Sequence, residues 1–197
     1  MEDAERAARR LVVGLGNPGE RYRWTRHNLG FRVVDSLAAR WRVEWGPECC
    51  RARFTASGPA DLAAPHTFMN RSGWSLRCLV ERFGYRPGDI LVVFDEVVLP
   101  LGALRLRGRG SPAGHRGLES VVENLRTDAV PRLRLGIAPR EGEVEGELAD
   151  YVLSEFEPAE RDLVERVVER GTDAVISWID RGLEATMNEF NGEAVAV

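Results

Sequence analysis

Apolar residues gather in short runs that turn residues separate. LVVGL at 11–15 ends in a glycine-rich turn, which indicates a buried strand, and LRLGI at 133–137 indicates another. ILVVF at 90–94 is apolar throughout, as is typical of a central strand covered on both faces. The carboxylates of Asp95 and Glu96 are therefore expected to emerge at the end of that strand.

Other segments carry apolar residues at the spacing of one helix face. They are 30–41, 76–83, 118–125 and a long segment from Pro158 to Ile179. Gly84 follows the second of these segments and is expected to cap that helix. Gly171 is expected to break the last helix.

Two further segments have the pattern of short strands. Residues 51–64 are expected to hold two strands around the turn at 57–59. ALRLR at 103–107 alternates apolar and basic residues, so one face meets the core and the other displays arginine. Strands and helices that alternate in this way predict an α/β fold: a single-domain, three-layer α/β/α sandwich with a mixed, largely parallel central sheet. A length of 197 residues with 44% hydrophobic content suits one domain.

The composition points to a protein of the cytoplasm. The first ten residues contain three acids and no apolar run, unlike a secretory signal or an acid-poor transit peptide. No stretch approaches the roughly 20 consecutive apolar residues of a membrane span. Cys49, Cys50 and Cys78 match neither a disulfide framework nor a C-x-x-C zinc half-site, so reduced thiols are expected.

Charge is distributed unevenly along the chain. The net charge is −4, which argues against a protein that coats nucleic acid generally. All 27 basic residues are arginine, which offers planar bidentate donors for phosphate. Several of them lie between Gly102 and Gly117, a segment without an acid, whereas acids gather between Glu141 and Glu169. A local phosphate-binding face on an otherwise acidic body explains this asymmetry.

GLGNPG at 14–19 matches the G-x-G-x-x-G of dinucleotide-binding folds, directly after a predicted strand. Two features oppose that interpretation. Pro18 and the polar residues at 20–27 do not form the first turns of a phosphate-binding helix, and Asp35 lies in a helical pattern instead of at the end of a second strand. The glycines can equally serve only to make a tight turn.

Five sequence blocks and the terminal EFNG together resemble the bacterial-type peptidyl-tRNA hydrolases, in that family's order and approximate spacing. The blocks are GLGNPG at 14–19, TRHN at 25–28, TFMNRSG at 67–73, FDEVVLPLG at 94–102 and AGHRGLES at 113–120. The resemblance implies a hydrolase domain over residues 11–192, an N-terminal extension over 1–10 and a C-terminal tail over 193–197. It also implies hydrolysis of the ester bond between an N-blocked peptide and the 3′ end of tRNA.

His27 is the natural general base, because an unperturbed imidazole titrates near neutral pH. Asp95, at the mouth of a neighbouring strand, would fix the ring tautomer and favour the imidazolium that forms as water gives up a proton. A purely structural histidine and a solvated strand-end acid are the alternatives.

Asn17 and Asn70 carry neutral amides that suit recognition of peptide amides and of a developing oxyanion. The resemblance implies that Asn17 distinguishes an N-blocked substrate from free aminoacyl-tRNA and that Asn70 holds the substrate near the reacting carbonyl. It also places Tyr22, Phe68 and Met69 along the cleft, although Asn17 and Asn70 can serve turns and Phe68 and Met69 can belong to the core.

Neither a nucleophilic serine elbow nor a metal-ligand motif occurs in the sequence, so we expect a water-activating enzyme without metal or other cofactor. Arg105 and Arg107 are expected to bind phosphates near the acceptor end of tRNA. Arg116 stands where the family more commonly has Asn, and Phe94 where it often has His. The expected partner is peptidyl-tRNA, with no membrane, no obligatory protein partner and a monomeric state. A non-catalytic RNA-binding protein, like the plant splicing proteins of this fold, is the alternative, and a nicotinamide-dependent oxidoreductase is a third hypothesis.

Overall fold

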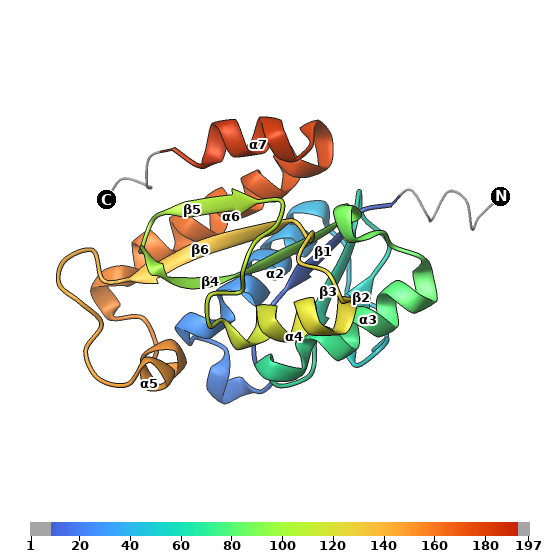
Figure 1. Ribbon diagram of the computed structural model, residues 1–197. Coiled ribbons are helices and arrows are strands. Elements are labelled where there is room, and N and C mark those ends of the chain that lie inside the picture. Colours follow the sequence, from blue (N-terminus) through green and yellow to red (C-terminus); the bar gives the residue numbers. More distant parts are fainter. Residues whose placement is uncertain (1–8, 193–197) are drawn as a thin grey trace.

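The computed structural model describes residues 9–192, which form one mixed sheet between two layers of helices (Figure 1). The predicted tail 193–197 lies outside the described residues, as does the predicted extension except for Arg9 and Arg10. Strands of the sheet are β1 Leu11–Gly14, β2 Ala52–Thr55, β3 Asp61–Pro65, β4 Ile90–Pro100, β5 Leu104–Arg107 and β6 Arg132–Ala138. Longer helices are α2 Leu29–Trp41, α3 Ser72–Phe83, α4 Arg116–Leu125, α5 Leu148–Leu153, α6 Arg161–Arg181 and α7 Leu183–Phe190. Short 3₁₀ turns are η1 Glu20–Tyr22, η2 Arg26–Asn28, η3 Met69–Arg71, η4 Pro87–Asp89 and η5 Pro158–Glu160.

The six strands are ordered β2-β3-β1-β4-β6-β5. The pairs β3·β1, β1·β4 and β4·β6 are parallel, whereas β2 and β5 pair antiparallel at the two edges. The predicted fold class is therefore confirmed, including a central strand, β4, that is buried on both faces.

Alternate residues of the central strands enter two separate cores. Val12, Leu91 and Val93 pack with α2 and α6, whereas Leu11 and Val92 pack with α3 and α4. This alternation follows from the pleat of a strand, and it makes three layers from uniformly apolar runs. Figure 1 shows α3 and α4 along one face of the sheet, with α2 and α6 behind the other.

Two of the predicted boundaries are wrong. β4 does not end before Asp95 but continues to Pro100, so Asp95 lies within the strand. α6 is not broken at Gly171. A Cβ on that glycine would lie 3.2 Å from Val33 Cγ2 and 3.3 Å from Leu135 Cδ2, so the missing side chain allows the helix to pack closely on α2 and the sheet.

The expectation of three reduced thiols is wrong for two of them. Cys50 and Cys78 form a disulfide, while Cys49 is free. The turn before β2 folds against α3 and brings the two Cα atoms to 5.6 Å, a separation that a disulfide can span. Among residues 9–192, no helix combines the length and the apolar content needed to cross a membrane.

Candidate active site

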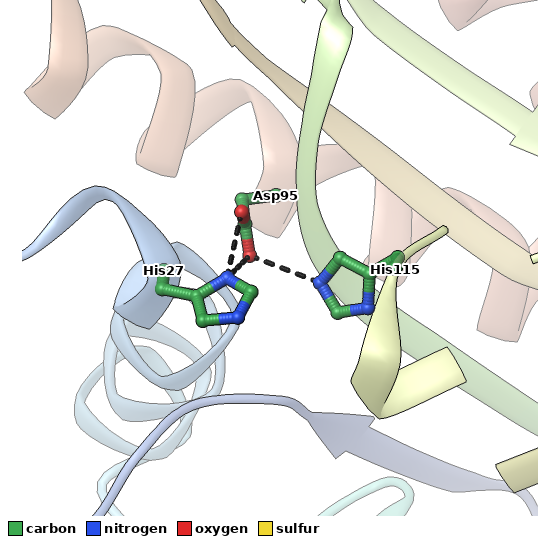
Figure 2. Close-up of side chains that lie close together, drawn as sticks. All are labelled: His27, Asp95 and His115. Atoms are coloured by element: carbon green, nitrogen blue, oxygen red, sulfur yellow. Dashed lines mark hydrogen bonds and ion pairs between the residues drawn. The ribbon is translucent and has the colours of Figure 1, made fainter. Parts of the chain in front are cut away.

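His27 lies in the turn η2, immediately before α2, and its side chain is almost fully buried. Its Nδ1 is 2.9 Å from both carboxylate oxygens of Asp95 (Figure 2). An ionised carboxylate only accepts hydrogen bonds, so Nδ1 carries the proton and donates it. Nε2 is then the unprotonated nitrogen that can take a proton from water.

Asp95 is placed by the ends of neighbouring strands. β1 pairs with β4 only as far as Val93, so Asp95 stands just beyond the end of β1, where it remains paired with Leu135 of β6. Burial raises the pKa of Asp95, but its electrostatic attraction to His27 and His115 and the hydrogen bonds that both rings donate hold that pKa well below its ordinary value. The residue is therefore a carboxylate at neutral pH, as the orientation of His27 requires.

His115 is a member of this cluster that the sequence analysis counted only among the residues of the basic segment. Its Nε2 is 3.2 Å from Asp95 Oδ1 (Figure 2). Its Nδ1 accepts the backbone N–H of Leu118 at 3.2 Å. The bond from Leu118 leaves the ring proton on Nε2, so His115 donates to the carboxylate. The signal in the sequence was a histidine that follows Gly114 and shortly precedes a predicted helix, which it caps.

His27, Asp95 and His115 each present one possible metal-ligand atom, and these atoms lie within 4.8 Å of one another. Histidine and carboxylate are ordinary ligands of divalent metal ions. In this arrangement, however, His27 Nδ1 and His115 Nε2 are both donors to Asp95. Metal at these atoms would have to replace both hydrogen bonds, so the absence of a metal stays a prediction for a chelator experiment.

Asn17 joins the glycine-rich turn to Met69, another residue that lines the cleft. Its Oδ1 accepts the backbone N–H of Met69 at 2.9 Å, and its own N–H donates to Asn28 Oδ1 at 2.8 Å. Asn28 returns a bond from Nδ2 to the Asn17 carbonyl, a locking role that the sequence analysis missed. The side-chain NH₂ of Asn17 is the group left to serve a substrate.

Close packing requires two glycines of this motif, whereas Gly19 has open space around it and a positive φ of 107°. A Cβ on Gly14 would lie 2.2 Å from the carbonyl oxygen of Gly30, and one on Gly16 would overlap the ring of Phe31. The chain then enters the short turn η1 and not a phosphate-binding helix. This local structure does not match the dinucleotide-binding motif, and the close approach of α2 explains Gly14 and Gly16.

A cleft of about 540 Å³ contains the cluster. Most of the predicted site residues line it, namely Asn17, Tyr22, His27, Phe68, Met69, Asn70, Asp95 and Arg116. Met69 is also part of the core, whereas Phe68 is 54% exposed and free to contact a substrate. The far wall is formed by α5, with Leu148, Val152 and Leu153, which the sequence analysis did not identify.

Arg105 and Arg107 do not line this cleft but lie on the edge strand β5. The alternation predicted for that strand is confirmed, because Leu104 and Leu106 are buried and Arg107 is exposed. Arg105 is half-buried and donates from Nη1 to the carbonyl oxygen of Asn191 at 2.9 Å. Any contact of these arginines with tRNA would therefore be made outside the cleft.

A histidine–aspartate pair in a cleft at the carboxyl ends of parallel strands defines an α/β protein equipped for general-base chemistry. Comparisons with known proteins define the family. Residues 11–196 match the family model described as peptidyl-tRNA hydrolase. Two curated relatives named peptidyl-tRNA hydrolase are from Synechococcus sp. (strain JA-3-3Ab), 44% identical over 95% of this chain and 84% of that protein, and from Akkermansia muciniphila, 40% identical over 92% and 95%.

The crystal structure of peptidyl-tRNA hydrolase from Acinetobacter baumannii is similar throughout. It superposes with a TM-score of 0.86 at 29% identity and covers 96% of this chain and 98% of its own. The chain belongs to the peptidyl-tRNA hydrolase family, and it is an enzyme of the hydrolase class. The resemblance found in the sequence is thereby confirmed.

Proposed function

We propose that the chain hydrolyses the ester bond between an N-blocked peptide and the 3′ end of tRNA, with water activated by His27. The observation that carries this mechanism is the bond from His27 Nδ1 to Asp95, which leaves Nε2 as the base in the cleft. Water loses a proton to Nε2 while its oxygen attacks the ester carbonyl. The oxyanion then collapses, and the ribose oxygen of tRNA leaves with a proton.

Asp95 stabilises the imidazolium that forms during this attack. Its carboxylate accepts from His27 and, through Oδ1, also from His115, so it is held from two sides. A fixed charge beside the base needs no reorganisation when the proton arrives. We therefore assign His27 as the base, Asp95 as its orienting carboxylate and His115 as the group that positions Asp95.

The remaining residues of the cleft are assigned to substrate recognition. The NH₂ group of Asn17 would donate to the N-blocking carbonyl, and Asn70 would bind the peptide near the reacting ester. Tyr22 and Phe68 would stack on the terminal adenine or cover the peptide. Arg116, exposed at the start of α4, would donate to a substrate carbonyl or a phosphate in place of the commoner Asn.

Arg105 and Arg107 would contact phosphates of the tRNA acceptor end from the edge of the sheet. Such contacts position a substrate without taking part in the chemistry. We further propose a monomer that acts in the cytoplasm without a protein partner or metal. The Cys50–Cys78 disulfide is unusual for the reducing cytoplasm. The proposed location is tested by alkylating free thiols inside living cells and then counting the alkylated cysteines of the purified protein.

The decisive experiment is incubation of the purified protein with N-acetylaminoacyl-tRNA, with and without a chelator. Release of N-acetylamino acid in both samples supports the proposal, as does a slower release of amino acid from free aminoacyl-tRNA. A protein that binds the tRNA without cleaving it would be the non-catalytic RNA-binding alternative. Activity that disappears with chelator and returns with a divalent metal would overturn the metal-free mechanism.

A further inference from the structure

Arg26 precedes the proposed base in the chain, but its side chain is buried away from the cleft. Its guanidinium forms a bidentate pair with Glu160, with Nη1 3.2 Å from Oε1 and Nη2 2.8 Å from Oε2. The rings of Tyr151 and Phe156 each lie with their centroids 4.6 Å from its Cζ. One arginine thus connects the turn that carries His27 to three later parts of the chain.

Tyr151 belongs to α5, the far wall of the cleft. Leu148, Val152 and Leu153 of this helix line the cleft, whereas Tyr151 does not and instead contacts Arg26. Helical geometry accounts for the difference from Val152 and Leu153, since successive residues of a helix point about 100° apart and Tyr151 is thereby turned away from both. The same helix therefore presents an apolar surface to the substrate and an anchoring ring to Arg26.

α5 has no fully buried side chain to hold it in place, and only Tyr151 and Val152 pack, partly buried, against the core. It comprises six residues, none of them buried, which is far too short for a helix that is stable by itself. The segment before it contains Gly142 and Gly146 in left-handed conformations, and Figure 1 shows the helix at the end of a long loop from β6. Its position must therefore be set by tertiary contacts.

Those contacts meet around Arg26. The backbone N–H of Arg26 donates to the carbonyl oxygen of Ser154, directly after α5, at 2.9 Å, and Thr25 forms an antiparallel bridge with Glu155. Tyr151 also donates from its hydroxyl to the carbonyl oxygen of Ile137 at 2.5 Å. Burial raises the pKa of this tyrosine, which keeps the hydroxyl a donor at neutral pH.

We propose that Arg26 is a positioning residue that fixes α5 at its distance from His27, so that Leu148 and Val152 form a subsite for an apolar side chain of the peptide. The inference rests on the proposed function, because the subsite matters only if a peptide ester lies against His27. Loss of the Arg26 contacts would let the wall move while the pair of His27 and Asp95 stays intact. Binding of the peptide would then weaken, and the chemical step would not.

Kinetics with two substrates that differ in one side chain test the inference. We expect Arg26→Met to raise the KM for N-acetyl-leucyl-tRNA about tenfold, because an apolar side chain loses its subsite, and to change kcat little. The KM for N-acetyl-glycyl-tRNA should hardly change, because glycine has no side chain to bind. Arg26→Lys retains the charge beside Glu160, so its KM for the leucyl substrate should lie between those of wild type and Arg26→Met.

A second variant protects the test against misfolding. Tyr151 is only half-buried, and Tyr151→Leu keeps an apolar side chain against the core while it removes both the ring beside Arg26 and the hydroxyl bond to Ile137. We expect the same selective rise in KM. Arg77→Met, in an exposed ion pair with Glu81 on α3, is the matched control and should leave both substrates unaffected.

Each outcome bears on one hypothesis. The positioning role would be overturned if the KM changed equally for the leucyl and glycyl substrates, or if kcat fell while KM stayed the same. It would also be overturned if Arg26→Met, or Tyr151→Leu, left the KM for the leucyl substrate unchanged. Wild-type protein that hydrolyses neither substrate would instead refute the proposed function, on which the subsite depends.

Discussion

Asp95→Asn is the substitution that most directly tests the proposed base. The change preserves size at a position that is 1% exposed, so it opens no cavity. It removes the charge that orients His27 and His115 and replaces one acceptor by an NH₂ group. If that group faces His27 Nδ1, where the carboxylate oxygens now lie at 2.9 Å, the ring must move its proton to Nε2 and can no longer act as a base.

The size of the effect follows from the lost interaction. A hydrogen bond to a charged partner is worth about 1.5–3 kcal/mol, which corresponds to a rate decrease of about 10- to 150-fold. The loss should fall on kcat, because the bond strengthens only as the imidazolium forms. The rate loss in Asp95→Asn should be smaller than the loss on removal of the His27 ring, since a fraction of the protein molecules will still have His27 in the productive tautomer.

The measurement is single-turnover hydrolysis of N-acetylaminoacyl-tRNA together with a direct tRNA-binding assay. We expect binding within about twofold of wild type beside the lowered rate, because no contact with phosphate is removed. Wild-type turnover in Asp95→Asn would refute the dyad. A loss of binding equal to the loss of rate would show that Asp95 acts on substrate affinity instead.

The charge of Asp95 also predicts how stability depends on pH. Folding lowers the pKa of the Asp95 carboxyl from about 3.8, its value in the unfolded chain. The carboxylate therefore stabilises the folded state at pH values above 3.8, and this stabilisation is lost as the pH falls from 3.8 toward the pKa of the folded protein. Chemical denaturation should therefore show a difference between wild type and Asp95→Asn at pH 6 that shrinks below about pH 4. A constant difference across this range would mean that Asp95 is not ionised in the folded protein.

Three other predictions concern separate parts of the molecule. His27→Ala should lower kcat at least about 100-fold while tRNA binding persists, and parallel loss of both would reject its role as base. Arg105→Ala and Arg107→Ala should each raise KM and reduce the log–log salt slope of binding by about one, so an unchanged slope would place these arginines away from tRNA. Cys50→Ala with Cys78→Ala should lower the unfolding free energy by about 3–4 kcal/mol, since the disulfide spans 28 residues, and three reactive thiols in unreduced wild type would contradict the bond.

Much of the fold could be predicted from local patterns. The runs at 11–15 and 90–94 and the alternation at 103–107 are strands because strand side chains alternate between faces, whether both faces are buried or only one. The central position of the run at 90–94 also follows from its composition. His27 and Asp95 could be paired because both were expected where parallel strands end, although β4 extends beyond that point.

Local patterns gave no information on segments without a buried face. α5 lies in an acidic stretch and has no buried residue, so no apolar period marks it, yet it forms a wall of the cleft. The break expected at Gly171 was wrong for the opposite reason. The low helix propensity of glycine was outweighed by close packing on Val33, which only the neighbouring helix could reveal.

The sequence by itself determined which residues could do chemistry and which strands and helices carry them, because residue type and periodicity are local properties. Tertiary structure alone decided the pairings: His115 with Asp95, Arg26 with Glu160, Arg105 with Asn191 and Cys50 with Cys78. These partners are 20 to 134 residues apart. Their meeting depends on strand order and on how the connecting segments cross the sheet, and the free energy that selects that arrangement comes from burial over the whole chain.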